Sequence, residues 1–458
     1  MGTKNVLKAA NDAELLSYII NVTPELAADI DLPRQGESIK EIGKIIVNNE
    51  RYRNAFINTV NLIGLTVIKR NAWADPWTFT ERGALRYGQQ IRELIIDLVN
   101  VYDYNDEFGD KTQFLETQVP NVFNYIHELN FQKFYAVTTS DNQLRMAFED
   151  EGGLFDFIDK AIGMLYESYQ YDNYQVNKYM LARRILDGTV TPAYISGYAG
   201  MTARQRVSAI KSVSNKFTFR SPNYNPAGVR RATRFEDQIL IVNTDFEADF
   251  STDVMATSFF KDEADMRARM VLVDGFGNLD DARLTEVLKS AYIPLTDDEV
   301  TALEAVPAVL ISREWFMDYY YALDNSTAEK YTDFYNPTTL ENNHFMHVWK
   351  VFSTSPFENA AVFGLTQPNV TGVTVSPSSA TITAGQSLQL KATVATAGFA
   401  NQAVAWSVDS TSAAAGVTID TRGILHVPSD VASATEITVT ATSIYKSTVT
   451  GTATVTVA

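Results

Sequence analysis

The sequence predicts an α+β protein made of two unlike parts, a mixed region over residues 1–369 and an all-β module over residues 370–458. Two patterns lead to this division. Apolar residues between 154 and 187 recur mostly at spacings of three, four or seven, which is typical of a long amphipathic helix. After residue 370, short segments alternate apolar and hydroxyl side chains, which is typical of strands with one buried face. The length of 458 residues suits about three domains of ~150 residues each.

The overall composition excludes several classes of protein. Apolar residues make up 45% of the chain, yet no stretch approaches the roughly 20 uninterrupted apolar residues that a membrane span needs. The chain has no cysteine, which excludes disulfides and thiolate metal sites. The first residues, MGTKNVLKAANDAELL, include no apolar segment behind the lysines, so we expect no secretory signal. The net charge of -17 disfavours sequence-independent binding to nucleic acid.

The all-β module differs in composition from everything before it. Of its 89 residues 29 are Ser or Thr and only seven are charged. About seven short period-2 segments in fewer than 100 residues favour a β-sandwich. The order of the segments VTVSP, TITAGQSLQLKATV, WSV, GILHV and TVTATS resembles a bacterial immunoglobulin-like domain of group 2. We therefore expect such a domain over residues 370–458, with Trp406 as a core aromatic residue.

Several elements are expected in the first 369 residues. The helix over 154–187 should be roughly 50 Å long at 1.5 Å per residue. A second helix is expected over 280–292, and Thr296 with Glu299 predicts a capping box for a third. The segments 308–324 and 344–364 have the composition of strands.

A long hairpin is expected over residues 73–104, because glycines and a polar stretch separate two segments with strand character. The predicted tip of this hairpin includes Arg82, Arg86 and Arg92. Positive charge on an extended segment of an acidic chain predicts contact with another copy of the chain, although three solvated charges would also fit the pattern.

Motifs that would support catalysis or cofactor binding are missing from the sequence. It contains neither a P-loop, nor G-x-G-x-x-G after a strand, nor G-x-S-x-G. His344 and His347 could ligate a metal from one helical face, but in a strand they point to opposite faces. We therefore expect no catalytic, cofactor or metal site.

One acidic segment leaves a choice open. In NTDFEADFSTD, residues Asp245, Glu247 and Asp249 would share one face of a strand, with Phe246 and Phe250 on the other. Such a row could bind a cation or supply the acid pair of a glycosidase. A half-buried strand whose acids face solvent or a basic neighbour explains the pattern equally simply.

Segments across the first 369 residues resemble the major capsid protein of small short-tailed, picovirus-like bacteriophages of Gram-positive hosts. The resembling segments include IIVNNERYRNAF, the acidic segment and HVWKVFSTSPFENAAVF, and they lie at residues 45–70, 119–148, 243–254, 271–276, 312–319 and 347–363. The resemblance weakens between Gly277 and Val306, where two short helices look inserted.

The resemblance implies a Hong Kong 97-type capsid fold for residues 1–369, followed by the immunoglobulin-like domain. It implies an N-terminal arm over about 1–60, an E-loop over 73–104, a spine helix over 154–187, an axial region over 188–308 and return strands over 309–369.

The function implied is that of a structural subunit and not an enzyme. Copies of the chain would form the pentamers and hexamers of a closed, icosahedral-type head shell, with the C-terminal domain outside. A scaffolding protein and a portal are expected partners, and the chain would be made in the host cytoplasm and end in the virion. The alternative is a secreted carbohydrate-active enzyme or adhesin with an accessory immunoglobulin-like domain.

The shell would enclose double-stranded DNA without binding it specifically, because the chain is acidic. A basic cluster at Arg230, Arg231 and Arg234 is therefore assigned to contact between subunits rather than to the genome. No membrane partner is expected.

Overall fold

The computed structural model describes most of the chain in several stretches. These are residues 39–49, 51–52, 56, 73, 75–85, 90–99, 122–140, 163–247, 269–322, 329–364 and 366–458. The chain divides into two compact units, each assembled from segments that are distant in sequence. The first comprises Met1–Ile91, His127–Asn177 and Met317–Ser353, and the second comprises Arg92–Ile126, Lys178–Phe316 and Thr354–Ala458.

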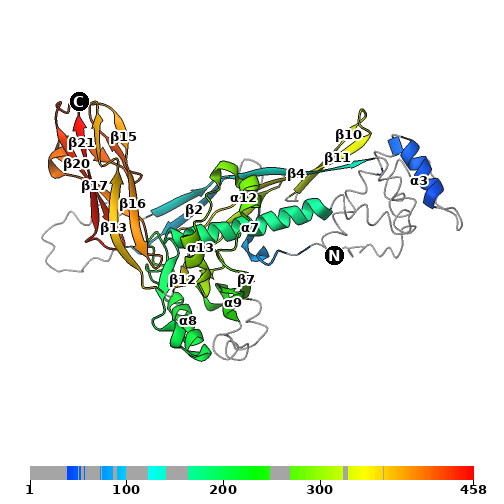
Figure 1. Cartoon of the computed structure of the whole chain (residues 1–458), viewed down its shortest axis with the longest axis horizontal. Helices are drawn as coiled ribbons and strands as arrows, with labels where there is room; N and C mark the ends of the chain where they lie inside the picture. The colour runs from blue at the N-terminus through cyan, green and yellow to red at the C-terminus, as the bar shows by residue number, and fades with distance from the viewer. Residues whose placement is uncertain are drawn as a thin grey trace, which may run out of the picture. The chain divides into compact units, whose positions relative to one another are not determined.

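The first unit contains a five-stranded sheet of order β1-β9-β11-β10, in which β4 also pairs with β11. The central strand β11 is antiparallel to both β4 and β10. Alternate residues of β11 are buried, as expected for a strand with one covered face. Helix α7 lies along this sheet (Figure 1), and the Tyr135 hydroxyl of β4 donates to Asp172 of the helix at 2.8 Å. The elements of this unit are α3 (Ile39–Asn48), η1 (Thr78–Thr80), β1 (Glu81–Leu85), β4 (Phe131–Ser140), β9 (Asp318–Tyr321), β10 (Glu329–Asn336) and β11 (Glu341–Val351).

Helix α7 spans Met164–Leu186, and its residues up to Asn177 belong to the first unit. The long helix predicted over 154–187 is thus confirmed over the part that the structure describes, while residues 154–162 lie outside the described residues. The helix ends where Gly188 adopts a φ of 68°, a left-handed conformation that glycine reaches without strain. The amide of Gly188 donates to the carbonyl of Ile185 at 3.0 Å.

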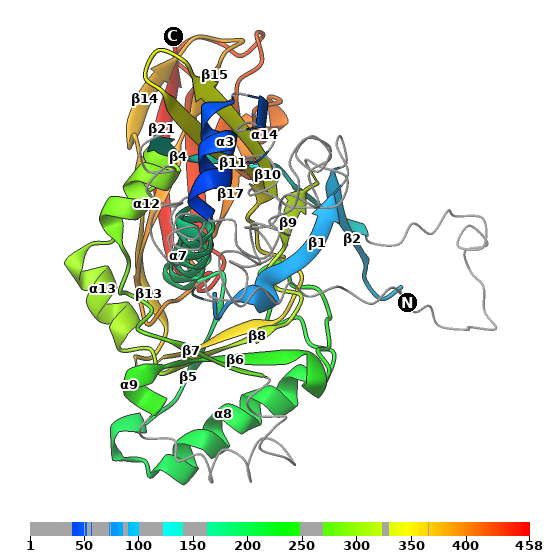
Figure 2. The same ribbon diagram turned by 90° about the vertical axis from the view of Figure 1, so that its right-hand side faces the viewer.

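The second unit is built around a five-stranded sheet of order β5-β12-β8-β6-β7. Every residue of β6, β8 and β12 is buried, so these strands form the centre of the unit. Helix α8 covers one face of the sheet (Figure 2), packing Val207 and Phe217 against Leu240 and Val242. The elements are β5 (Thr191–Tyr194), η4 (Tyr198–Gly200), α8 (Ala203–Phe217), η5 (Phe235–Asp237), β6 (Gln238–Asn243), β7 (Met270–Val273), β8 (Ala308–Ser312) and β12 (Ala360–Gly364).

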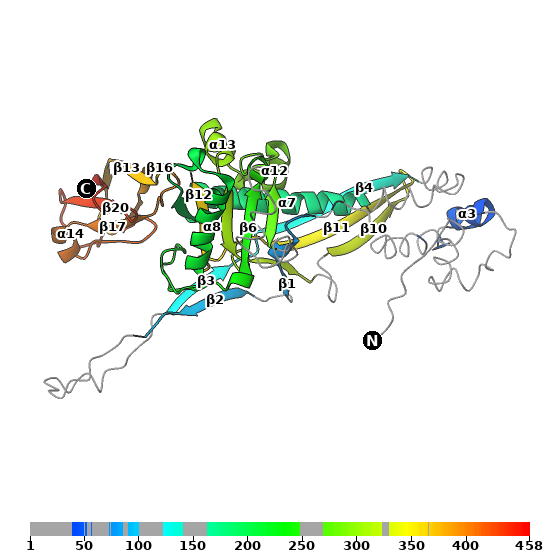
Figure 3. The same cartoon turned by 90° about the horizontal axis from the view of Figure 1, so that it is seen from below.

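Strands β2 (Ile91–Ile96) and β3 (Val122–His127) pair only with each other among the described residues (Figure 3). The hairpin predicted over 73–104 is therefore wrong in its pairing. Strand β1 pairs in parallel with β9, not with β2. The glycines and polar residues marked the break between two strands correctly, but a local pattern does not encode a partner more than 200 residues away.

The acidic segment after Asn243 is a second correction. Residues Thr244–Glu247 form a short helix, α9, where we predicted a strand. Asp and Glu are disfavoured in strands and favoured in the first turn of a helix. The ring of Phe246 lies 6.0 Å from that of Tyr198. This turn therefore packs its aromatic residue against the apolar cluster between α8 and the sheet. Residues 248–268, including Asp249 and Phe250, lie outside the described residues.

The short helices expected after residue 280 are confirmed as α12 (Asp281–Leu288), η6 (Lys289–Ala291) and α13 (Asp297–Glu304). Thr296 and Glu299 form the predicted capping box at the start of α13. The segment 308–324 is not one strand, because its residues divide between β8 and β9 in different units. Among the residues that the structure describes, no helix is both long and apolar enough to cross a membrane.

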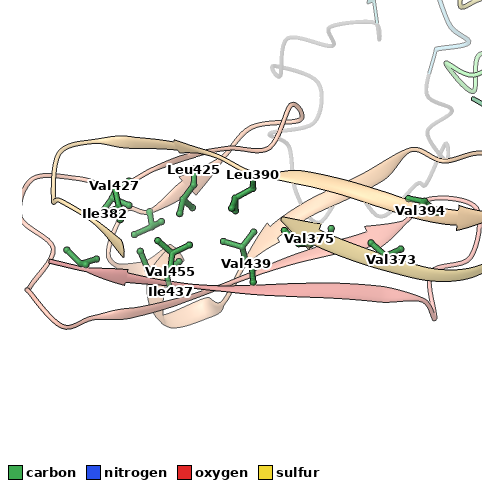
Figure 4. Packing of buried hydrophobic residues seen from close by; sticks show 14 of the residues in the cluster. Val373, Val375, Ile382, Leu390, Val394, Leu425, Val427, Ile437, Val439 and Val455 are labelled. Carbon is green, nitrogen blue, oxygen red and sulfur yellow. The ribbon is translucent and has the colours of Figure 1, made fainter. Parts of the chain in front are cut away.

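Residues 369–458, called the C-terminal module below, contain strands with their own apolar core. Val373, Leu390, Val439 and Val455 point into this core (Figure 4), and Trp406 packs against it while remaining partly exposed. The strands form sheets β13-β16, β14-β21-β20-β17 and β15-β19-β18. The elements are β13 (Asn369–Ser376), β14 (Ser379–Ile382), β15 (Ser387–Gln389), β16 (Lys391–Ala397), β17 (Val404–Val408), α14 (Ser410–Ala414), β18 (Thr418–Ile419), β19 (Ile424–His426), β20 (Glu436–Ser443) and β21 (Thr450–Val457).

Replacing Phe217, the fully buried aromatic residue at the end of α8, should destabilise the second unit. We expect Phe217→Ala to lower the free energy of unfolding by about 3–5 kcal/mol, because the change leaves a cavity against the sheet. Phe219→Ala, at a side chain that is 72% exposed, should change it by no more than about 0.5 kcal/mol. Urea denaturation of the two variants checks this, and similar losses in both would contradict the packing described.

Candidate assembly surface

The β2–β3 pair is attached to the second unit through one face. Glu93 of β2 accepts a hydrogen bond from the Ser355 hydroxyl at 2.7 Å. Four positions further along the chain, just after β2 ends, Asp97 forms a 2.8 Å ion pair with Arg230. The ring of Phe123 on β3 lies 6.3 Å from that of Phe357. Because successive side chains of a strand point to opposite faces, these contacts direct Leu94 and Ile96 of β2 outward.

The outward face of the pair is apolar. Leu94 and Ile96 are 59% and 60% exposed, although they are large aliphatic residues. Further exposed apolar side chains lie beyond β2 and along β3, on either face of the pair, namely Leu98, Val99, Val122, Tyr125 and Ile126. Exposed apolar groups gathered in this way mark interaction sites in soluble proteins. We call these seven residues the assembly surface.

Sequence reasoning missed this surface, although a signal was present. The segment IRELIIDLV carries aliphatic residues on both faces, at Ile91 and Ile95 as well as at Leu94, Ile96 and Leu98. A two-stranded sheet can cover only one of its faces with its own unit, so such a strand requires a second covering.

The arginines predicted to contact other subunits do not form one cluster. Arg82 is partly buried in β1, Arg92 is exposed in β2, and Arg86 lies outside the described residues. Arg230 pairs with Asp97, as described above. Arg234 is exposed and directly precedes η5. Their role between subunits stays a prediction.

Arg231 is engaged within its own unit. Its guanidinium donates to Glu358 at 2.5 Å and lies 3.4 Å from Glu314. Glu358 is 3% exposed and also accepts from the Ser312 hydroxyl at 2.8 Å. Burial raises the pKa of Glu358, and the adjacent Arg231 acts in the opposite direction. This pair therefore links the segment before β6 to the end of β8 and the start of β12.

The first unit contains a buried polar cluster centred on Lys350. The Lys350 ammonium of β11 is fully buried, donates to the Asn173 side chain of α7 and lies 3.7 Å from Asp318 of β9. Asn173 in turn donates to Asp75 at 2.6 Å. A buried charge needs such partners, so the cluster has a structural explanation.

Two carboxyl groups of this cluster have altered acidity. Burial raises the pKa of Asp75 to about 6, while hydrogen bonds from the Trp77 amide and Asn173 act in the opposite direction. Burial likewise raises the pKa of Asp318, against the opposing effect of Lys350. The Thr80 hydroxyl and the Asn177 side-chain amide also hydrogen-bond to Asp318, so this carboxyl group is partnered on several sides.

The described residues also contain no group of three or more His, Asp or Glu side chains placed to hold a metal ion. His344 and His347 lie on opposite faces of strand β11, as expected for a strand. The His344 ring pairs with Asp333 at 2.9 Å, and His347 contacts the Thr332 hydroxyl at 3.0 Å.

Comparison with known proteins gives one consistent result. A family model described as the Phi29-like phage major capsid protein matches residues 21–364. The major capsid protein of Bacillus phage PZA is 30% identical over 397 residues, covering 85% of this chain and 81% of the relative. That of Bacillus phage B103 is 29% identical over 401 residues, with the same coverage. A solved capsid structure of Staphylococcus phage Andhra aligns with a TM-score of 0.46 and 12% identity, over 64% of this chain and 84% of that one.

These matches identify a structural protein of bacteriophage heads. The chain belongs to the family of Phi29-like phage major capsid proteins. It is accordingly a component of the virion that assembles with copies of itself, and not an enzyme. The alternative of a carbohydrate-active enzyme or adhesin has no support.

The raised pKa of Asp75 predicts a specific dependence of stability on pH. The folded chain holds a proton on Asp75 up to about pH 6, whereas the unfolded chain loses it near 3.8. The contribution of Asp75 to the free energy of unfolding therefore falls as the pH rises from about 4 to 6. The fall is roughly 1–3 kcal/mol, at ~1.4 kcal/mol per pKa unit. Asp75→Asn should remove this part of the decline.

Denaturation at pH 4, 5, 6 and 7 would measure this decline in the free energy of unfolding. Glu128→Gln, at an exposed position, is the control. Parallel stability profiles for the unaltered chain and Asp75→Asn would contradict the assignment.

Proposed function

We propose that the chain forms a closed head shell of pentamers and hexamers, and that the assembly surface is where one subunit covers another. The observation that carries this proposal is the β2–β3 pair, which is held by Glu93 and Asp97 on one face and exposes Leu94 and Ile96 on the other. An interface between proteins buries about 800 Å² per partner and places its apolar residues at the centre. An apolar strand pair flanked by charged residues suits such an interface.

The shell subunit would have the Hong Kong 97-type fold. In this assignment α7 is the spine helix, and the β2–β3 pair takes the place of the extended hairpin. The sheet β5-β12-β8-β6-β7 with α8 forms the axial part. The order of these elements along the chain supports the assignment, as does the membership of residues 21–364 in a capsid family.

The C-terminal module would be an immunoglobulin-like domain of group 2 displayed on the outside of the shell. Its separate sheets and its own apolar core support an independently packed β-sandwich. The family match ends at residue 364, shortly before the module begins, which supports a domain boundary near residue 370.

Assembly would involve a scaffolding protein and a portal, and it would take place in the host cytoplasm. The finished shell would enclose double-stranded DNA without specific contacts, because a wall with a net charge of -17 per chain repels phosphate. A repelling wall keeps the enclosed DNA mobile, which suits both packaging and release.

Charges placed on the assembly surface should prevent shell formation without unfolding the subunit. We expect Leu94→Lys and Ile96→Lys to leave the chain soluble and to abolish shells, because each would bury an ammonium at an apolar interface. Ile444→Lys is the matched control, since Ile444 in the C-terminal module is also 60% exposed. Sedimentation and negative-stain microscopy after co-expression with the phage scaffolding protein measure the outcome. Shells from Ile96→Lys at the yield of the control would refute the proposal.

Free subunits should not retain duplex DNA at about 150 mM salt, where charges are screened beyond ~8 Å. Arg230 and Arg231 are already paired with Asp97 and Glu358, which reduces what they can offer to phosphate. A mobility-shift assay checks this, with Arg230→Gln and Arg231→Gln as comparison variants. Micromolar binding that weakens with salt and disappears in these variants would show a DNA-binding surface instead.

A further inference from the structure

The end of helix α7 and the C-terminal module meet within the second unit (Figure 1). The last carbonyl groups of a helix have no partner inside the helix and need one outside it. Here the Gln402 side-chain amide donates to the carbonyl of Leu186 at 2.8 Å. The Gln402 backbone amide donates to the carbonyl of Asp187 at 3.4 Å. A residue of the C-terminal module thus caps α7 at its end in the second unit. The part of the second unit outside the module is called the capsid body below.

The backbones on the two sides of this junction approach each other closely. A Cβ atom at Gly188 would lie 2.6 Å from the Ala400 carbonyl oxygen, closer than real Cβ contacts allow. At Gly398, which has a φ of 62°, a Cβ would lie 2.8 Å from the Gln367 carbonyl carbon. Ala400 between them is fully buried. Close backbone contact of this kind leaves little room for relative movement.

The turn that makes these contacts is itself strained. Phe399 adopts a φ of 60°, which a non-glycine residue keeps only when its surroundings hold it there. Its ring takes part in lining a cavity of about 350 Å³, shared with Leu186, Ala302 and Val306. Helix α13 contributes Asp298, Glu299 and Ala302 to this lining, so it forms a wall with both charged and apolar side chains on the body side of the junction.

The connecting chain is also tied to the module. The Tyr445 hydroxyl donates to the carbonyl of Pro368 at 3.4 Å, and the Lys446 ammonium donates to Asn369 at 3.1 Å. Both residues belong to the turn between β20 and β21. The residues that join the two parts are thus anchored at the start of β13.

We propose that the C-terminal module is fixed in one orientation on the capsid body, and that the turn 398–402 is the docking element that caps α7. The surface formed by Leu186, Asp187, Gly188 and α13 takes the chain's own module as its partner. Every copy would then present the module at the same angle to the body. The inference concerns a single chain and does not depend on the proposed shell.

Electron paramagnetic resonance distance measurements on the full chain test this directly. The chain has no cysteine, so Glu286→Cys on α12 and Ser433→Cys in the module provide two unique sites for spin labels. The Glu286 side chain is 72% exposed and Ser433 is also exposed. A fixed module gives a single narrow distance distribution. A broad distribution in this otherwise unaltered chain would overturn the proposal without any further variant.

The role of the cap is tested by Gln402→Glu in the same doubly labelled chain. A carboxylate facing the negative end of α7 cannot donate and is repelled, so we expect loss of the narrow peak. Gln386→Glu makes the same chemical change at an exposed position of the module and should keep that peak. Circular dichroism confirms that both variants remain folded. A narrow peak retained by folded Gln402→Glu would refute the docking role of the turn.

Discussion

A fully buried ammonium group determines how the first unit is held together. Lys350 lies in the central strand β11, and its partners Asn173, Asp318 and Glu81 come from α7, β9 and β1. Its charge also lies 4.8 Å from the centre of the Phe352 ring. Removing one member of such a cluster leaves an uncompensated charge, which costs about 3–5 kcal/mol. The sheet and the helix therefore have to assemble together around this side chain.

Features that depend on residues close together in the chain could be predicted from the sequence. The end of α7, the capping box of α13 and the strands of the C-terminal module each depend on residues only a few positions apart. The composition change near residue 370 and the family resemblance could be read in the same way. In all these cases the residues that decide the structure are neighbours in the chain.

Features that depend on residues far apart in the chain could not be predicted from the sequence. Nothing in residues 81–85 indicates that their partner is β9 at 318–321, and the expected hairpin was wrong for that reason. The pairing of charges within the chain is a second example, because Arg230 and Arg231 pair with Asp97 and Glu358, which lie more than 100 residues away. The exposure of one face of β2 likewise depends on contacts of Glu93 with Ser355 and of Asp97 with Arg230, which lie far away in the sequence.

The exposed aliphatic face of β2 and β3 has a consequence for the chain before it joins a particle. Strand pairs with free edges and exposed Leu, Ile and Val side chains are templates for irregular aggregation. For free subunits, assembly into particles therefore competes with precipitation. The outcome depends on how long the subunits remain free. The rate at which growing particles take up subunits would then set the highest concentration of free subunits that can be sustained without loss.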